Sequence, residues 1–310
     1  MGIRIRRFTW ADIGAIAGLH RASEPVDHAG RNADVASLER RWRRPGSQPE
    51  KDCLVAEAGG TVVGYALRWV VTGTRQCTVD AVVLPDWRRR GVGRRLLART
   101  VEQARAEGAG SLDMRARDDE PAAMAFCRAL GFGQVRVWCR MWLQPLRIPS
   151  FSFPAGFGWR YFRPGRDEAA YAEIVNETFA DHWGIGRTSA QRVAELVGQP
   201  GFDPESIIFA TRQAEIVGVC YARYLEREVC GREYSAAHIG PVGVRAACRG
   251  QGLARAMMAA CLRQCRRQRI QAAELDVDET NASAIHVYGD CGFEHLFRIL
   301  WYRLDLRDTR

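Results

Sequence analysis

The sequence predicts an α/β protein that contains two copies of one domain. The segment VVLPDWRRRGVGRRLL around Arg88 returns as VGVRAACRGQGLARAM around Arg249, 161 residues later. The dipeptide Gly131-Phe132 returns at Gly292-Phe293 with the same offset. Both halves also alternate between strand-like and helix-like patterns. Two features at one offset indicate a duplication, and 310 residues are enough for two domains of ordinary size.

The first half begins with a short strand, IRIRRFTW, and a helix near Asp12–His20. The segment CLVAEAGGTVVGYALRWVV then predicts a hairpin with a Gly-Gly turn, and CTVDAVVL predicts a buried strand. An amphipathic helix is expected over Gly93–Glu107, because apolar residues recur there at helical spacing. The strand SLDMRAR, a helix that ends at Gly131-Phe132 and the strand QVRVWCRMWL complete this half.

The second half repeats this order. The strand GWRYFRPG leads into a helix over Asp167–Phe179, and SIIFATRQAEIVGVCYARYLE predicts the hairpin. The buried strand AHIGPVGV precedes a helix over Gly252–Arg269, and then come AAELDVD, a helix that ends at Gly292-Phe293 and the strand EHLFRILWYRL. The segment LQPLRIPSFSFPAGFG, rich in Pro, Gly and Ser, reads as the linker. We therefore expect domains over residues 1–147 and 148–310.

The composition is that of a soluble globular protein. The hydrophobic share is 47%, and no apolar run approaches the roughly 20 residues that cross a bilayer. The start, MGIRIRRFTW, lacks the apolar core of a signal peptide, so we expect a cytoplasmic location. The net charge of +9 comes mostly from arginines scattered through both halves rather than from a stripe. This pattern does not indicate a nucleic-acid partner.

Cysteines do not predict a metal site in this chain. Ten cysteines are present, without a C-x-x-C pair or a Cys/His cluster at zinc-ligand spacing. Cys261 and Cys265 lie one helical turn apart, but two ligands alone do not make a structural site. We expect reduced thiols that act mostly as small core residues, and no metal.

A glycine-rich motif stands at the predicted strand-to-helix junction of each half. Both copies fit R-x-x-G-x-[GA]. Small residues there let backbone N–H groups approach an anion, and the dipole of the following helix favours negative charge. The alternative is a plain tight turn. The buried strand before the motif and the helix after it favour a diphosphate cradle. Its residues are Arg249, Gly250, Gln251, Gly252, Leu253 and Ala254 in the second copy, and Arg88, Arg89, Arg90, Gly91, Val92 and Gly93 in the first.

With these motifs, the chain resembles the GCN5-related N-acetyltransferase (GNAT) family in both halves. The resemblance implies two tandem GNAT domains, each a mixed, mostly antiparallel sheet flanked by helices. It implies acetyl-CoA as the cosubstrate, with its diphosphate in the loop and its pantetheine along the preceding strand at Val242 and Val244, or at Val83 in the first copy. More closely, the chain resembles the mycothiol synthases and related actinobacterial two-domain enzymes. This likeness rests on the tandem layout and on two segments, VNETFADHWG at Val175–Gly184 and FDPESIIFA at Phe202–Ala210.

The resemblance assigns the chemistry to the second copy. The pattern N-x-x-A-x-x-x-Y-x-x-x-G-F places Asn281 as a cofactor contact and Tyr288 as the acid that protonates the departing thiolate. The first copy has Glu120 and Cys127 at these positions, so we expect it to be degenerate and non-catalytic. The alternative for Tyr288 is a helix tyrosine that only packs on the sheet.

The acceptor amine also needs a base. His238 lies on the predicted strand six residues before Val244, and an imidazole suits this work at neutral pH. The mycothiol synthases usually have a carboxylate at about this position, so His238 would replace it in role. The alternatives are a satisfied core histidine, or a water path for the proton. Candidate acceptor contacts, each equally open to a capping or surface role, are Glu177, Asp181, His182, Trp183 and Asp278.

The sequence therefore predicts an acetyl-CoA-dependent N-acetyltransferase that acts on a primary amine of a small molecule. Thiol-sugar precursors and amine antibiotics are candidate acceptors, and the internal duplication is compatible with a monomer. One alternative is a non-catalytic module that binds or senses acyl-CoA, which has no need of an acid such as Tyr288. Another is a protein N-acetyltransferase, for which the sequence shows no peptide-groove signature.

Overall fold

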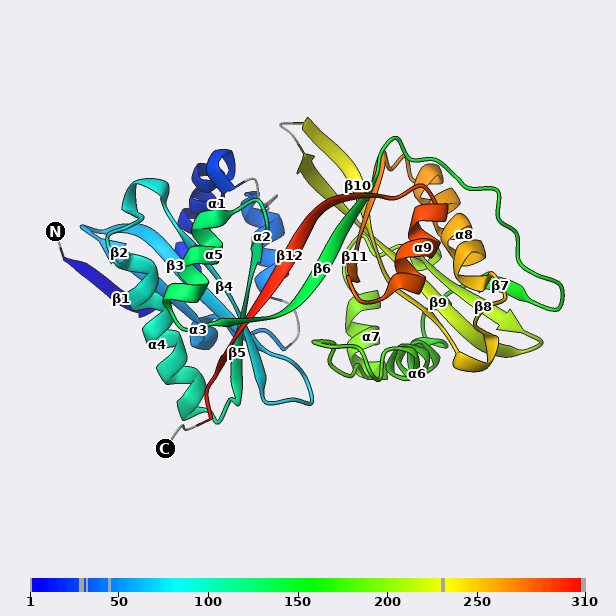
Figure 1. The fold of residues 1–310 in the computed structure, drawn as a ribbon, viewed down its shortest axis with the longest axis horizontal. Coiled ribbons are helices and arrows are strands. Elements are labelled where there is room, and N and C mark those ends of the chain that lie inside the picture. Colours follow the sequence, from blue (N-terminus) through cyan, green and yellow to red (C-terminus); the bar gives the residue numbers. More distant parts are fainter. Residues whose placement is uncertain (1, 28–30, 32, 44–45, 230–231, 308–310) are drawn as a thin grey trace. The chain divides into compact units, whose positions relative to one another are not determined.

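The computed structural model describes residues 2–27, 31, 33–43, 46–229 and 232–307 (Figure 1). The chain divides into two compact units. Unit 1 comprises Met1–Arg136 together with Ile299–Arg310, and unit 2 comprises Val137–Arg298. Within the described residues, no helix is both long and apolar enough to span a membrane.

Unit 1 has a mixed sheet in the order β1-β2-β3-β4-β5-β12. Among its described residues, β4 and β5 pair in parallel and the other neighbouring strands are antiparallel. The strands are β1 (Ile3–Arg7), β2 (Cys53–Ala58), β3 (Thr61–Val70), β4 (Gln76–Val83), β5 (Ser111–Arg117) and, from Ile299 onward, β12 (Glu294–Asp305). The helices are α1 (Ile13–Asp27), α2 (Val35–Trp42), α3 (Pro49–Asp52), α4 (Val92–Ala106) and α5 (Pro121–Ala129), with 3-10 turns η1 (Trp10–Asp12) and η2 (Pro85–Trp87).

Unit 2 repeats this plan in the order β6-β11-β10-β9-β8-β7. Its one parallel pair is β10 with β11. The strands are, from Val137 onward, β6 (Gly133–Leu143), and then β7 (Gly158–Tyr161), β8 (Ile207–Arg212), β9 (Glu215–Val229), β10 (Arg232–Val244) and β11 (Ala272–Asp278). The helices are α6 (Glu168–Thr178), α7 (Ala190–Val197), α8 (Leu253–Arg267) and α9 (Ala282–Asp290), with 3-10 turns η3 (Pro204–Ser206) and η4 (Ala246–Cys248). The predicted α/β fold, with a mixed, mostly antiparallel arrangement of strands and flanking helices in each half, is confirmed.

The last strand of each half pairs in the other unit. Met141 of β6 lies opposite Leu275 of β11, and Tyr302 of β12 lies opposite Met114 of β5. The compact units therefore differ from the contiguous ranges 1–147 and 148–310, which follow the duplication in the sequence. The physical reason is that apolar alternation marks β6 and β12 as strands but carries no information on which sheet receives them.

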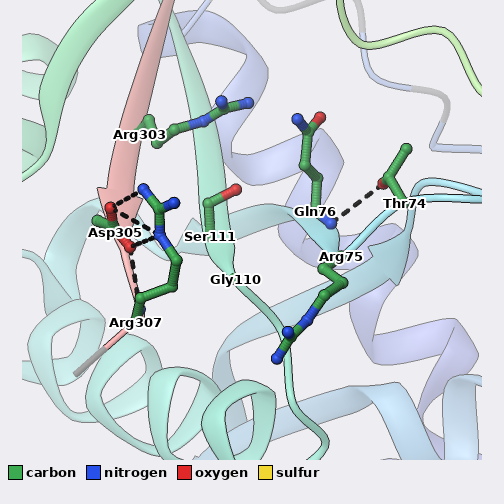
Figure 2. A pocket seen from close by; sticks show the side chains of 8 residues that line it. All are labelled: Thr74, Arg75, Gln76, Gly110, Ser111, Arg303, Asp305 and Arg307. Atoms are coloured by element: carbon green, nitrogen blue, oxygen red, sulfur yellow. Dashed lines mark hydrogen bonds and ion pairs between the residues drawn. The ribbon is translucent and has the colours of Figure 1, made fainter.

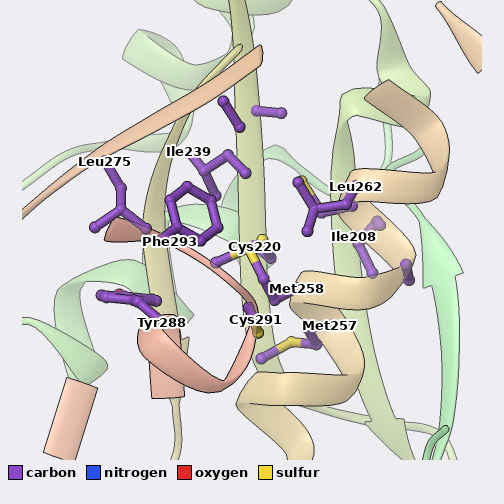
Figure 3. Packing of buried hydrophobic residues seen from close by; sticks show 14 of the residues in the cluster. Ile208, Cys220, Ile239, Met257, Met258, Leu262, Leu275, Tyr288, Cys291 and Phe293 are labelled. Carbon is purple, nitrogen blue, oxygen red and sulfur yellow. The ribbon is translucent and has the colours of Figure 1, made fainter. Parts of the chain in front are cut away.

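The sheet of unit 2 is covered by helices on both faces. On one face α8 and α9 pack over an apolar cluster that includes Ile239, Met257, Tyr288 and Phe293 (Figure 3). On the other face α6 and α7 cover a second cluster, which includes Tyr171 and residues of β8 and β9. The helices that follow the glycine motifs begin at Val92 and Leu253, close to the predicted starts, because the amphipathic pattern specifies them locally.

Candidate active site

The central feature of unit 2 is the separation of β10 from β11. The two strands pair only from Ala236 with Ala272 to His238 with Glu274, although both strands continue. Directly after His238, the pairing of β10 with its other neighbour, β9, shifts register between Ile239 and Val242. The Gly240-Pro241 peptide bond, which lies within this shift, is cis. Beyond this bulge β10 keeps β9 as its partner from Val242 to Val244. The register of β10 with β11 thus leaves this segment paired on one side, with backbone groups available on the other.

The predicted cradle follows directly after β10. Arg249 donates from Nε to the Val244 carbonyl at 3.0 Å, which fixes the start of the loop. Gly250 and Gly252 have φ values of 76° and 82°, and a Cβ at either position would meet no heavy atom within 4 Å. Gly252 caps α8, whose first backbone N–H groups lack acceptors within the helix. Alternating left-handed residues before a helix N-terminus aim these groups at one point, so the loop fits the diphosphate of a coenzyme A ester.

Tyr288 lies on α9 and is 9% exposed, packed beside Phe293 with a ring-centroid distance of 6.3 Å (Figure 3). Burial raises the pKa of its phenol well above the usual range, and the nearby thiols of Cys220 and Cys291 raise it further. The phenol is therefore protonated at neutral pH. At the start of the same helix, Asn281 accepts from the Ala284 N–H at 3.1 Å through Oδ1, as an N-cap does.

His238 has a carboxylate partner that sequence reasoning missed. Its Nδ1 lies 3.0 Å from Oε1 of Glu274, which is 2% exposed. Glu274 also accepts from Arg227 at 2.8 and 3.0 Å and from Nη1 of Arg140 at 2.7 Å. Burial alone would raise the pKa of Glu274, but the bond from His238 and the two guanidinium groups hold it well below the usual range. The alternation in AAELDVD marked a strand, yet only the parallel register with β10 brings Glu274 to His238.

Four side chains gather near the end of β11, on the side of the sheet covered by α6. Asp278 lies opposite Trp138 of β6 in the strand register, and Trp138 contacts Trp183 at 6.3 Å between ring centroids. The fourth is His182. The pKa of His182 is lowered, mainly by burial. The charge of Asp278 opposes this effect, and the charge of Arg249 adds to it. His182 and Asp278 are thus close enough for their charges to interact, and Trp183 lies near the same end of β11 through its contact with Trp138.

The remaining acceptor candidates lie differently. Glu177 forms an ion pair with Nε of Arg245 at 3.0 Å, and Arg245 also pairs with Glu173 at 3.1 Å. Asp181 is exposed and acts on His182 through its charge. The end of α6 that leads to these residues packs closely on β10, since a Cβ at Gly243 would overlap Thr178.

Comparison with known proteins identifies the family. A sequence profile described as the acetyltransferase (GNAT) family matches residues 15–132 and 169–293, which is most of the chain. The chain belongs to the GNAT acetyltransferase family. The predicted resemblance is confirmed in both halves, and the protein is an N-acetyltransferase by family.

Similar proteins cover nearly the whole chain. A protein of a Parafrankia strain named mycothiol acetyltransferase is 32% identical over 323 residues, 98% of each chain. A protein of Salinispora tropica with the same name is 32% identical over 94% of this chain and 92% of its own. The crystal structure of a GCN5-related N-acetyltransferase from Sphaerobacter thermophilus superposes with a TM-score of 0.78 and 26% identity over 99% and 97% of the two chains. A tandem GNAT protein from the clavulanic acid biosynthesis pathway, at 22% identity, shares the fold with a TM-score of 0.76 over both full chains.

The first GNAT copy keeps the cradle but not its surroundings. Arg88 donates to the Val83 carbonyl at 3.1 Å, as Arg249 does to Val244, and Gly91 caps α4 with φ of 79°. Position 89, however, holds an arginine at φ of 60° where the second copy has Gly250. From Cys77 to Val83, β4 pairs with β3 without a register shift, so this segment of β4 lacks the bulge seen in β10. Burial raises the pKa of Cys127 to about 11, which keeps this thiol uncharged.

A charge network also occupies the separating strands of unit 1. β4 and β5 stop pairing after Thr78 and Asp113, and Asp80 follows on β4. Arg31 lies 3.9 Å from Asp80 and 3.3 Å from Asp27, and the charge of Glu120 at the start of α5 acts on it as well. Asp27 in turn binds Arg88 of the cradle at 2.9 Å. The second GNAT copy has a different network, in which Arg140 pairs with Glu274 and Asp276 of β11.

A pocket in unit 1 lies at the opposite end of the same strands (Figure 2). It encloses about 380 Å³ around the first paired residues of β4 and β5, Gln76 and Ser111. Its cations already have partners: Arg75 donates to the Gly108 carbonyl at 2.9 Å, and Arg303 binds Asp113 at 2.7 Å. The pocket is therefore separate from the GNAT cradle and holds none of the predicted site residues.

Proposed function

We propose that the second copy transfers an acetyl group from acetyl-CoA to a primary amine of a small molecule. The observation that carries this proposal is the separation of β10 from β11, bordered by His238 at its last paired position and followed by the bulge and the cradle. A coenzyme A ester with its diphosphate in the loop would run its pantetheine along Val244 and Val242. Its thioester would then lie at the bulge.

The proposed reaction is a direct attack in a ternary complex. The amine nitrogen forms a bond to the acetyl carbon while a backbone N–H near Val242 polarises the carbonyl. The amine proton passes to His238, directly or through a water. The carbon–sulfur bond then breaks, and the thiolate takes the proton of the Tyr288 phenol, which burial keeps protonated. The phenol regains its proton from solvent.

The acceptor is proposed from the relatives and from the pocket. Similar proteins include ones named mycothiol acetyltransferase, so the amine of a thiol-sugar precursor is the first acceptor to test. His182, Trp183 and Asp278 suit such a molecule, since an indole face packs on sugar rings and a carboxylate attracts an ammonium group. Other amino sugars and amine antibiotics form the second group to screen.

The Tyr288→Phe variant tests the assignment of the acid. Removing the hydroxyl leaves the thiolate without its proton donor, so we expect kcat to fall by about 10²-fold or more. The affinity for acetyl-CoA should stay within about twofold, because the cradle is intact. Release of free CoA thiol measures kcat, and calorimetry measures binding. Undiminished turnover of Tyr288→Phe with the best acceptor would remove Tyr288 from the mechanism.

A further inference from the structure

We propose that Glu274 is a positioning residue that fixes the imidazole of His238 with its proton on Nδ1 and its free lone pair on Nε2. This inference rests on the proposed function, in which His238 takes the amine proton. Glu274 lies on β11, is 2% exposed, and takes part in no step described above. It lies 3.0 Å from Nδ1 of His238, across the last residue pair before β10 and β11 separate.

The charge of Glu274 decides the direction of this hydrogen bond. Arg227 donates to both carboxylate oxygens, at 2.8 Å to Oε1 and 3.0 Å to Oε2, and Arg140 donates to Oε2 at 2.7 Å. An ionised carboxylate only accepts, so Nδ1 of His238 must donate and must carry the proton. A neutral imidazole carries one proton, and Nε2 is then the basic nitrogen. His238 is 22% exposed, so its ring has a side open to solvent or to a bound amine.

The Glu274→Gln variant reverses this arrangement while it keeps the shape. The amide oxygen prefers the position of Oε2, where two guanidinium donors meet it, one each from Arg140 and Arg227. The amide NH₂ then occupies the position of Oε1, where it faces Nδ1 of His238 and one guanidinium donor, Nη2 of Arg227, rather than the two that meet Oε2. Nδ1 must accept, the proton moves to Nε2, and His238 loses the lone pair that takes the amine proton. We expect kcat to fall by about 10²- to 10⁴-fold, as for other bases held in the wrong tautomer, with unchanged affinity for acetyl-CoA.

Asp276→Asn provides a matched control. Asp276 lies two residues further on β11 and accepts from Nε and Nη2 of Arg140 at 2.5 and 2.9 Å, so it shares an arginine with Glu274. No contact of Asp276 with His238 is present among the described residues. If Glu274 only supported the fold, the two variants would lower kcat similarly. We expect Asp276→Asn to keep kcat within about threefold, since the interaction of Arg140 with Glu274 remains.

The tautomer is read directly by nitrogen-15 NMR of the imidazole at alkaline pH. His238 is assigned by comparison with His238→Gln. We expect the proton on Nδ1 in the wild type and on Nε2 in Glu274→Gln. A wild-type proton on Nε2 would overturn the proposal, even if Glu274→Gln failed to fold. So would an unchanged tautomer in Glu274→Gln, or an equal loss of kcat in Asp276→Asn. If no amine is acetylated at all, the proposed function fails, while the spectra still decide the role of Glu274.

Discussion

Asn281 combines a structural contact with a proposed contact to the cosubstrate. Its Oδ1 caps α9 by accepting from the Ala284 N–H, and the hydroxyl of Ser283 also donates to it at 3.0 Å. The proposed contact to acetyl-CoA would use the amide nitrogen, which is chemically distinct. Because the two contacts use different atoms, two substitutions can separate them.

Asn281→Asp and Asn281→Ala make this separation. Asp caps a helix as well as Asn does, so Asn281→Asp should unfold with a free energy within about 0.5 kcal/mol of the wild type. Asn281→Ala should lose about 1 kcal/mol with the cap. Both variants lack the amide donor, and both should bind acetyl-CoA less tightly, by about tenfold. Urea unfolding and calorimetry give the two quantities. Wild-type affinity in both variants would leave Asn281 as a cap alone.

Residues were predictable from the sequence where their role depends on local spacing. Tyr288 and Asn281 stand at fixed distances within one helix and its cap, so their joint placement follows from the chain. Glu274 acts through a residue 36 positions away, and its contact with His238 exists only in the parallel register of two strands. That register depends on the packing of the whole sheet and has no local signature.

At the scale of elements, the two copies share a loop-and-helix unit and differ in the strand before it. The strand, loop and helix could be predicted because glycine spacing and amphipathic periodicity are local. The bulge in β10, the straight register of β4 and the ions around Arg31 were not predictable, because each depends on pairing between distant segments. Because of these differences, we expect acetyl-CoA to bind only to unit 2.

The matched variants Gly252→Ala and Gly91→Ala test this asymmetry. Both glycines cap a helix at nearly the same φ, 82° and 79°, and both leave open space around a Cβ. Each substitution should therefore cost about 1–2 kcal/mol of stability from backbone strain. Only Gly252→Ala should weaken acetyl-CoA binding, and the wild type should bind one molecule per chain. Calorimetry measures both. A stoichiometry of two, or an equal loss of affinity in Gly91→Ala, would assign a second site to unit 1.

At the scale of the whole molecule, the exchanged strands make each compact unit depend on a strand from the other half of the duplicated sequence. Cys139, Met141 and Leu143 of β6 are buried in the main apolar cluster of unit 2. In unit 1, Leu300 and Tyr302 of β12 are buried on a strand that pairs with β5. Separating the two halves at the linker would therefore deprive each unit of one strand and expose the apolar face of each exchanged strand.

Fragments of the chain test this dependence. The fragment 137–298 retains the β6 residues that pair with β11, so we expect it to unfold cooperatively and to bind acetyl-CoA like the full chain. The fragment 148–310 lacks these residues. Each of the three lost buried side chains contributes about 2–5 kcal/mol. Their sum exceeds the lower end of the stability of an ordinary domain, which is about 5–15 kcal/mol. This fragment should therefore aggregate or stay unfolded. Co-expression with 1–147 should restore it, because that fragment supplies β6 and accepts β12.

Size-exclusion chromatography and thermal melting compare the fragments. Equal, cooperative melting of 148–310 alone and of 137–298 would show that the exchanged strands are dispensable for the stability of unit 2.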